Sequence, residues 1–130
     1  MYYRRKILLG FLQVFCGEIP TMDFQKYLFL LNQEMDEPVY EFIPNEFGCY
    51  SFQANQDLST LTKYKIVKES GDFWNLADKT DYLKQLKTDD RILIDKFYTQ
   101  FHRLKGEALT KYVFENYPYY AIHSSTAGNL

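Results

Sequence analysis

The chain has 130 residues and a formal net charge of −2 at pH 7, with 46% hydrophobic and 18% aromatic residues. This length predicts one domain, and the apolar content excludes a disordered chain because it can offset the entropy lost on folding. Proteins that bind nucleic acid mainly by neutralising phosphates are usually basic. The slightly acidic balance therefore argues against strong non-specific binding, while it allows a local basic patch.

The cysteines and the N-terminal segment indicate where the protein resides. Cys16 and Cys49 show no CxxC spacing and have no histidine at ligand spacing, so we expect two reduced, buried thiols. Basic residues precede an apolar run near the N-terminus, but Gln13 interrupts this run and no small-residue cleavage site follows it. No apolar run approaches the ~20 residues of a membrane-spanning helix. We expect a soluble, cytoplasmic protein.

Two helices and a short strand are predicted first. Residues 3–15 carry a wide apolar stripe, and Gly17 suits the left-handed residue that ends a helix. Thr21 can cap a second helix, at whose positive end Asp23 is favourable, and a strand follows over residues 39–43. The expected inward-facing residues are Ile7, Leu8, Phe11, Leu12 and Phe15 in the first helix, and Phe24, Tyr27, Leu28, Leu31 and Met35 in the second.

A third helix and a hairpin are predicted next. Ser51 is a suitable N-cap for a helix whose Ala54, Leu58 and Leu61 face the core. Strands over 65–69 and 73–76 flank a Ser-Gly-Asp turn, which predicts a β-hairpin that would form a wing. The opposite stripe of the helix presents hydrogen-bonding side chains, namely Gln53, Gln56, Asp57, Thr60 and Lys63.

The rest of the chain returns to helical periodicity. We expect a short helix over 80–86, a longer one over 89–104 and a last one over 107–116. The inward-facing residues of the longer helix are Leu93, Phe97, Phe101 and Leu104. The sequence thus predicts an α+β, mostly helical, winged-helix-like domain. Its core of three helices, a short strand and a β-hairpin covers about 3–77, and a C-terminal helical extension covers about 80–122.

No arrangement of residues suggests catalysis. The two histidines are far apart in the sequence and lack HxxxH or HExxH spacing. The acidic pairs Asp36-Glu37 and Asp89-Asp90 occur at predicted helix ends, where carboxylates suit the helix dipole. The six glycines are scattered and form no phosphate-binding loop. We expect a protein that is not an enzyme, with no catalytic residue, metal site or cofactor.

Two basic features are candidates for contact with double-stranded DNA. The polar stripe of the third helix could read base edges or phosphates, and the lysines that follow continue this surface into the hairpin, although lysines there also serve solubility. The basic, aromatic N-terminal arm could lie against phosphate or form a solvated helix start. Asp57, within the stripe, would be repelled by phosphate. The candidate residues are Gln53, Gln56, Thr60, Lys63, Lys65, Lys68, Arg4 and Arg5.

A tyrosine-rich segment near the C-terminus is the third candidate surface. It either folds back on its own domain or contacts a partner protein, a second domain or a second copy, because tyrosine is favoured at interfaces. A homodimer is compatible with this composition. The candidate interface residues are Tyr112, Tyr117, Tyr119 and Tyr120.

Longer motifs resemble two known families. The stretches YYRRKILL, FQKYLFLLNQE, YEFIPNEFGCYSFQANQDLSTLTKY and KYVFENYPYYAIHS resemble the N-terminal region of a group of uncharacterised bacterial proteins. In that group a second domain of unknown function usually follows, which would place a further domain after residue 130. More distantly, QKYLF and the Y-x-F-x-P-x-x-F-G segment are similar to the Panacea (SocA-like) antitoxins. Cys49 stands where that pattern has proline, and Tyr27 where it has leucine.

These features lead to two hypotheses. The first is a non-enzymatic recognition module that binds DNA through the third helix and the wing. The second is a protein–protein interaction module of antitoxin or intramolecular regulatory type, which the resemblance to antitoxins implies and the tyrosine-rich segment favours. Neither hypothesis involves a membrane.

Overall fold

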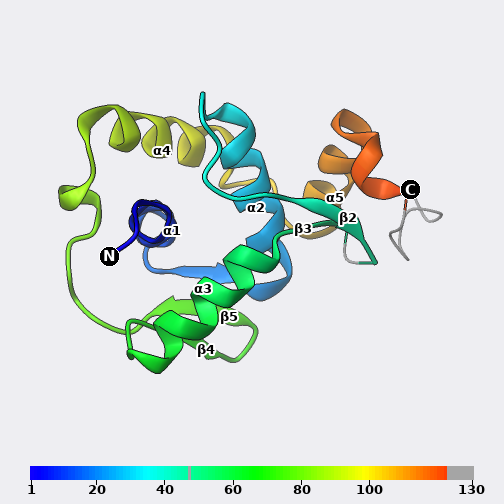
Figure 1. The fold of residues 1–130 in the computed structure, drawn as a ribbon. Coiled ribbons are helices and arrows are strands. Elements are labelled where there is room, and N and C mark those ends of the chain that lie inside the picture. The colour runs from blue at the N-terminus through cyan, green and yellow to red at the C-terminus, as the bar shows by residue number, and fades with distance from the viewer. Residues whose placement is uncertain (47, 123–130) are drawn as a thin grey trace.

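A mostly helical α+β fold is seen in the computed structural model of the protein, which describes residues 1–46 and 48–122 (Figure 1). Helix α1 lies in the middle of the molecule, and in Figure 1 it is viewed nearly end-on with the other elements around it. The elements in chain order are α1 (Tyr3–Val14), β1 (Glu18–Pro20), α2 (Thr21–Glu34), β2 (Ile43–Asn45), β3 (Gly48–Tyr50), α3 (Phe52–Lys63), β4 (Val67–Ser70), β5 (Phe73–Leu76), the 3-10 turn η1 (Leu83–Gln85), α4 (Thr88–Phe101), α5 (Gly106–Asn116) and the 3-10 turn η2 (Pro118–Ala121).

The strands form two small antiparallel sheets. In the first sheet the order is β1-β5-β4, with Trp74 of β5 paired with Ile19 on one side and Glu69 on the other. In the second sheet β2 pairs with β3, and this hairpin lies between α2 and α3 in the sequence. Strand β1 therefore ties the α1–α2 connection to the β4–β5 hairpin that follows α3.

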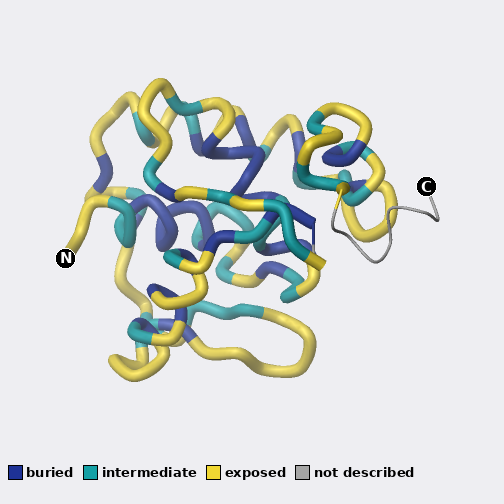
Figure 2. Tube along the Cα trace, turned by 45° about the vertical axis from the view of Figure 1, so that its right-hand side comes forward, coloured by how far each residue is buried: buried dark blue, intermediate teal, exposed yellow. Residues whose placement is uncertain are grey.

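The core surrounds α1, whose residues 7–12 are all buried (Figure 2). A helical stretch that is apolar on every side, as residues 7–12 are, belongs in the interior, because no face of it gains from contact with water. The ring of Phe11 lies 5.7 Å from that of Phe24 and 5.9 Å from that of Phe97, so α1, α2 and α4 share one aromatic cluster. The predicted inward-facing residues of α1 and α2 are buried except Phe15 and Met35, which are half-buried at the edge of the core.

The predicted end of α1 is confirmed, with one difference. Gly17 has a left-handed φ of 82°, but Cys16 before it is also left-handed, with a φ of 63°. The N–H groups of these two residues donate back to Gln13 and Leu12, which closes the helix as a Schellman motif. Cys16 is consequently exposed, which contradicts the prediction of a buried thiol, whereas Cys49 is buried and its pKa is raised to about 12 by burial.

The strand predicted over residues 39–43 is wrong, because strands form at Ile43–Asn45 and Gly48–Tyr50 instead. The N–H groups of Val39 and Tyr40 donate to Oδ1 of Asn32 at 2.8 and 3.1 Å, so they are not available to a neighbouring strand. One buried amide thus fixes the path of the chain after α2.

The predicted hairpin after α3 is confirmed, as β4 and β5. Ser70 pairs with Phe73 across a two-residue turn, in which Gly71 takes a φ of 61°. A positive φ at the first central residue alone is the pattern of a type II′ turn, which suits the twist of a hairpin.

The helices of the C-terminal half lie close to their predicted positions. The helix expected over 80–86 is only the single turn η1. The helix expected over 89–104 is α4, which ends earlier, at Phe101. Ile94 is fully buried where Leu93, the predicted residue, is half-buried. Among the described helices, none is both long enough and apolar enough to cross a membrane.

Candidate nucleic-acid interface

Helix α3 begins and packs as its sequence predicts. Ser51 is the N-cap, and its Oγ accepts a hydrogen bond of 3.1 Å from the N–H of Ala54. Ala54, Leu58 and Leu61 are buried and hold the helix against the core. The rest of the helix surface is polar, apart from Phe52 at its first turn, which is 64% exposed.

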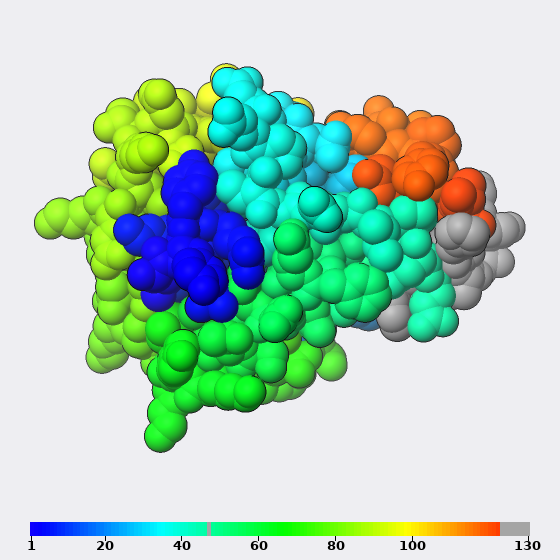
Figure 3. Space-filling model, in the orientation of Figure 1, coloured from blue at the N-terminus to red at the C-terminus, as the bar shows by residue number. Residues whose placement is uncertain are grey.

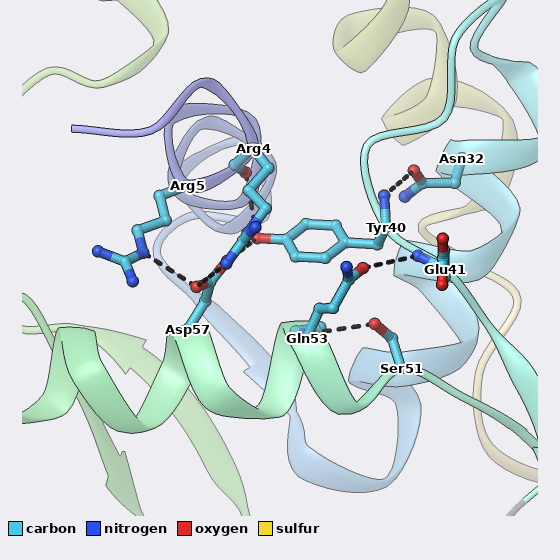
Figure 4. A network of polar contacts seen from close by, with 9 residues as sticks. Arg4, Arg5, Asn32, Tyr40, Glu41, Ser51, Gln53 and Asp57 are labelled. Carbon is cyan, nitrogen blue, oxygen red and sulfur yellow. Dashed lines mark hydrogen bonds and ion pairs between the residues drawn. The ribbon is translucent and has the colours of Figure 1, made fainter.

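Asp57 does not lie on the exposed stripe of α3 where it was predicted, since its side chain is fully buried. Its carboxylate faces the first turn of α1 and the segment after α2 (Figure 4). Oδ2 accepts from Arg4 Nε at 2.7 Å and from the Tyr40 hydroxyl at 2.8 Å. Oδ1 accepts from Arg5 Nε at 2.9 Å and from Arg4 Nη2 at 3.1 Å. Four charge-assisted hydrogen bonds thus satisfy the buried carboxylate.

These contacts set the ionisation of the group. Burial alone would raise the pKa of Asp57, but the hydrogen bonds from Arg4, Tyr40 and Arg5 outweigh it and hold the pKa below its usual value. Burial and the bond to Asp57 both raise the pKa of Tyr40 far above that of a free tyrosine. Asp57 is therefore a carboxylate at neutral pH, and Tyr40 remains a hydroxyl donor.

The burial of Asp57 changes the electrostatics of α3. It is the one acidic residue of the helix sequence, and two arginines compensate its charge. The exposed surface of α3 accordingly carries no carboxylate. Its exposed residues are Phe52, Asn55, Gln56, Ser59, Thr62 and Lys63.

The structure divides the predicted α3 and hairpin residues into two groups. Gln56, Lys63, Lys65 and Lys68 are exposed. Gln53 and Thr60 are only half-buried, and Oε1 of Gln53 accepts a hydrogen bond of 3.0 Å from the N–H of Glu41. The surface open to a ligand is therefore rotated slightly from the predicted stripe, toward Asn55, Ser59 and Thr62.

The N-terminal segment forms the start of a helix, which is one of its two interpretations from the sequence, and not a separate arm. Helix α1 begins at Tyr3, and Arg4 and Arg5 in its first turn bind Asp57, so both guanidinium groups are tied to α3. The helix start is therefore confirmed, but its two arginines are not simply solvated, because Asp57 binds both of them. In Figure 3 the N-terminal residues lie directly beside α3 on one face of the molecule.

Lys65 has an unusual backbone. It follows the C-cap of α3 with a φ of 61°, a left-handed conformation that normally favours glycine. Its N–H donates to Thr62 and that of Ile66 donates to Leu61, which is again a Schellman motif. Within the described part of the chain, Lys63, Lys65 and Lys68 form no ion pair, so their charges are uncompensated by direct contacts.

Most of the predicted tyrosine surface is half-buried and packs against the core. The rings of Tyr117 and Tyr120 lie 5.0 and 4.6 Å from that of Phe29, and the ring of Tyr112 lies 5.5 Å from that of Phe101. Tyr119, by contrast, is 62% exposed. Three of the four tyrosines therefore fold back on the core, and Tyr119 remains open to a partner.

Residues 1–46 and 48–122 contain few other hollows or side-chain clusters that could bind a ligand or a metal ion. A surface hollow of about 490 Å³ lies between the end of α1 and the residues after β5, and Cys16, Glu18, Asp78 and Lys79 are among its lining residues. Oδ1 of Asp78 is buried there without a hydrogen-bond partner. No group of three or more metal-ligating side chains occurs among these residues, so the hollow offers no assembled cation site.

Comparison with known proteins gave no relatives: no protein-family model, no curated protein and no solved structure matches this chain.

Proposed function

We propose that the protein is a winged-helix-like module that binds double-stranded DNA through α3 and the β4–β5 hairpin. The observation that carries this proposal is the inward orientation of Asp57, which leaves the exposed surface of α3 free of acidic side chains. Phosphate groups can then approach this helix without meeting a carboxylate on it.

The topology supports the same function. Three helices, a strand after the first helix and a hairpin after the third, with that strand paired to the second hairpin strand, are the arrangement expected of a winged-helix domain. In such a domain the third helix would enter the major groove and the hairpin would lie beside the sugar–phosphate backbone.

Each part of this surface has a chemical role in the proposal. Lys63, Lys65 and Lys68 supply cations for backbone phosphates at the junction of α3 and the hairpin. Asn55 and Gln56 present exposed amide groups, which can form paired hydrogen bonds with adenine. Lys65 retains its side chain although glycine would fit its backbone better, and strain of this kind is concentrated at functional positions.

The test is a salt titration of binding to a mixed-sequence duplex, followed by fluorescence anisotropy. We expect micromolar or tighter affinity at low salt and a linear fall of log affinity with log salt. A variant with Lys63→Glu, Lys65→Glu and Lys68→Glu should lose binding. The matched control carries the same charge change at three exposed lysines elsewhere, Lys79→Glu, Lys84→Glu and Lys96→Glu, and should retain most of it.

A second candidate function is a protein–protein interaction of antitoxin or intramolecular regulatory type. Tyr119 and Ile122, both 62% exposed near the C-terminal end of the described chain, favour it. If no duplex binds even at low salt, this candidate becomes the better one. Tyr119→Ala should then weaken capture of a defined partner, whereas Tyr117→Ala would be uninformative because that ring packs on Phe29.

A further inference from the structure

Arg5 is attached to the protein by one end of its guanidinium group only. Its Nε donates to Oδ1 of Asp57 at 2.9 Å, and its Cζ lies 4.6 Å from the centre of the Tyr2 ring. Among the described residues no acceptor binds its two terminal nitrogens, and neither is a buried unsatisfied atom. These nitrogens are therefore not fully buried, although the side chain as a whole is only 18% exposed, and in Figure 4 they point away from Asp57.

Arg4 is bound differently. It uses both Nε and Nη2 on the same carboxylate, at 2.7 and 3.1 Å. If Arg5 were absent, Oδ1 would keep its bond from Arg4, and Oδ2 would keep those from Arg4 and Tyr40. The buried carboxylate thus needs Arg4 far more than it needs Arg5.

The cluster also has an excess of positive charge. Two guanidinium groups share one carboxylate, and no second acidic group forms an ion pair with either of them within the described residues. A guanidinium that is held at Nε and stacked on an aromatic ring is preorganised, because less freedom is lost when its free edge binds an anion. Two parallel N–H donors on that edge match two oxygens of a phosphate.

We propose that Arg5 binds a backbone phosphate of the nucleic acid on α3, with Asp57 and Tyr2 as the groups that position it. This inference rests on the proposed function and extends its surface from α3 and the hairpin to the first turn of α1. That turn lies beside α3 on the face seen in Figure 3. Arg4, in contrast, serves to hold α3 in place and makes no phosphate contact.

The experiment measures the salt dependence of duplex binding for the full chain and for single variants. Arg5→Gln should reduce the slope of log affinity against log salt by about one, as expected for the loss of one phosphate contact. Its urea midpoint should stay close to that of the wild type, because Asp57 remains satisfied. Lys96→Gln removes the same charge from an exposed site on α4 and should leave the slope unchanged.

The outcomes separate this inference from the function on which it rests. If the wild type binds with a steep salt dependence and Arg5→Gln has the same slope, Arg5 does not contact phosphate and the inference is wrong. If the wild type does not bind duplex at any salt concentration, the proposed function fails and the inference fails with it. If the Arg5→Gln variant does not fold, the Tyr2→Ala variant tests the inference instead. Tyr2 is 61% exposed, so its loss should weaken binding several-fold without unfolding, and unchanged affinity would overturn the inference.

Discussion

The hydroxyl group of Tyr40 donates a hydrogen bond of 2.8 Å to Oδ2 of Asp57 and so joins the segment after α2 to α3. The N–H of Tyr40 is itself held by Asn32 of α2. Because Arg4 and Arg5 of α1 bind the same carboxylate, α1, α3 and the segment after α2 meet at one buried charge. The position of the candidate binding helix therefore depends on the ionisation of a single residue.

Asp57→Asn should lower the free energy of unfolding at pH 7 by about 3 kcal/mol, the lower end of the range for breaking a buried ion pair, because Arg4 is partly exposed. Urea denaturation followed by circular dichroism measures this loss. Asp95→Asn, at an exposed site on α4, is the control and should change stability by less than about 0.5 kcal/mol. Equal stability of the two variants would show that the Asp57 contacts contribute nothing.

The same residue predicts a pH dependence. The pKa of Asp57 is lower in the folded chain than the ordinary value of about 3.9, so the unfolded chain binds the proton more readily. Its contribution to stability is complete above that ordinary value and is lost as the pH falls through the folded pKa. The stability difference between wild type and Asp57→Asn should consequently shrink as the pH falls below about 4, and a constant difference would contradict this assignment.

Asn32 should be equally important for the path of the chain. Asn32→Ala removes the acceptor of two N–H groups, those of Val39 and Tyr40, at a site where the side chain is 1% exposed. Each unsatisfied buried donor costs about 1–3 kcal/mol, so we expect a loss of about 3 kcal/mol in urea denaturation. Asn55→Ala, on the exposed surface of α3, should be nearly neutral. A small effect at Asn32 would mean that the segment after α2 is held by other contacts.

The helices and the β4–β5 hairpin could be predicted because their signals are local. Apolar periodicity, the Ser51 cap and the Gly71 turn all lie within a few residues of the structure they specify. The strand predicted over 39–43 failed for the opposite reason. Its N–H groups are taken by Asn32, a residue of the preceding helix that strand propensity does not consider.

The candidate site was predicted only in part. Asp57 is three residues after Ala54 and four before Leu61, so helical geometry places it at the border of the buried face, and this was the available signal. Its partners Arg4 and Arg5 are 53 and 52 residues away in the sequence. Periodicity shows which face a residue is on, but it does not identify a charged partner that distant. Such a pairing becomes visible only in the folded chain.

Two glycines allow the cost of overpacking the core to be compared with the cost of backbone strain. Gly48 has a φ of 92°, and a Cβ there would lie 2.9 Å from the ring of Phe114, which is 6% exposed. Gly71 has a φ of 61° with no atom near the position of a Cβ. Gly71→Ala should therefore cost about 1–2 kcal/mol from backbone strain, and Gly48→Ala should cost about 1–3 kcal/mol more because the core has no room. Similar losses in urea denaturation would mean that Phe114 moves aside freely.

Lys65 should show opposite effects on stability and on binding. Its φ of 61° is costly for any residue with a Cβ, so Lys65→Gly should raise the free energy of unfolding by about 1 kcal/mol. Lys63→Gly, within the last turn of α3, should instead lower it by about 1 kcal/mol, because glycine weakens a helix. Both changes remove one exposed charge and should weaken duplex binding, as measured by anisotropy. If Lys65→Gly were more stable yet bound duplex as tightly as the wild type, the strained lysine would have no role in binding and the DNA interface would have to exclude it.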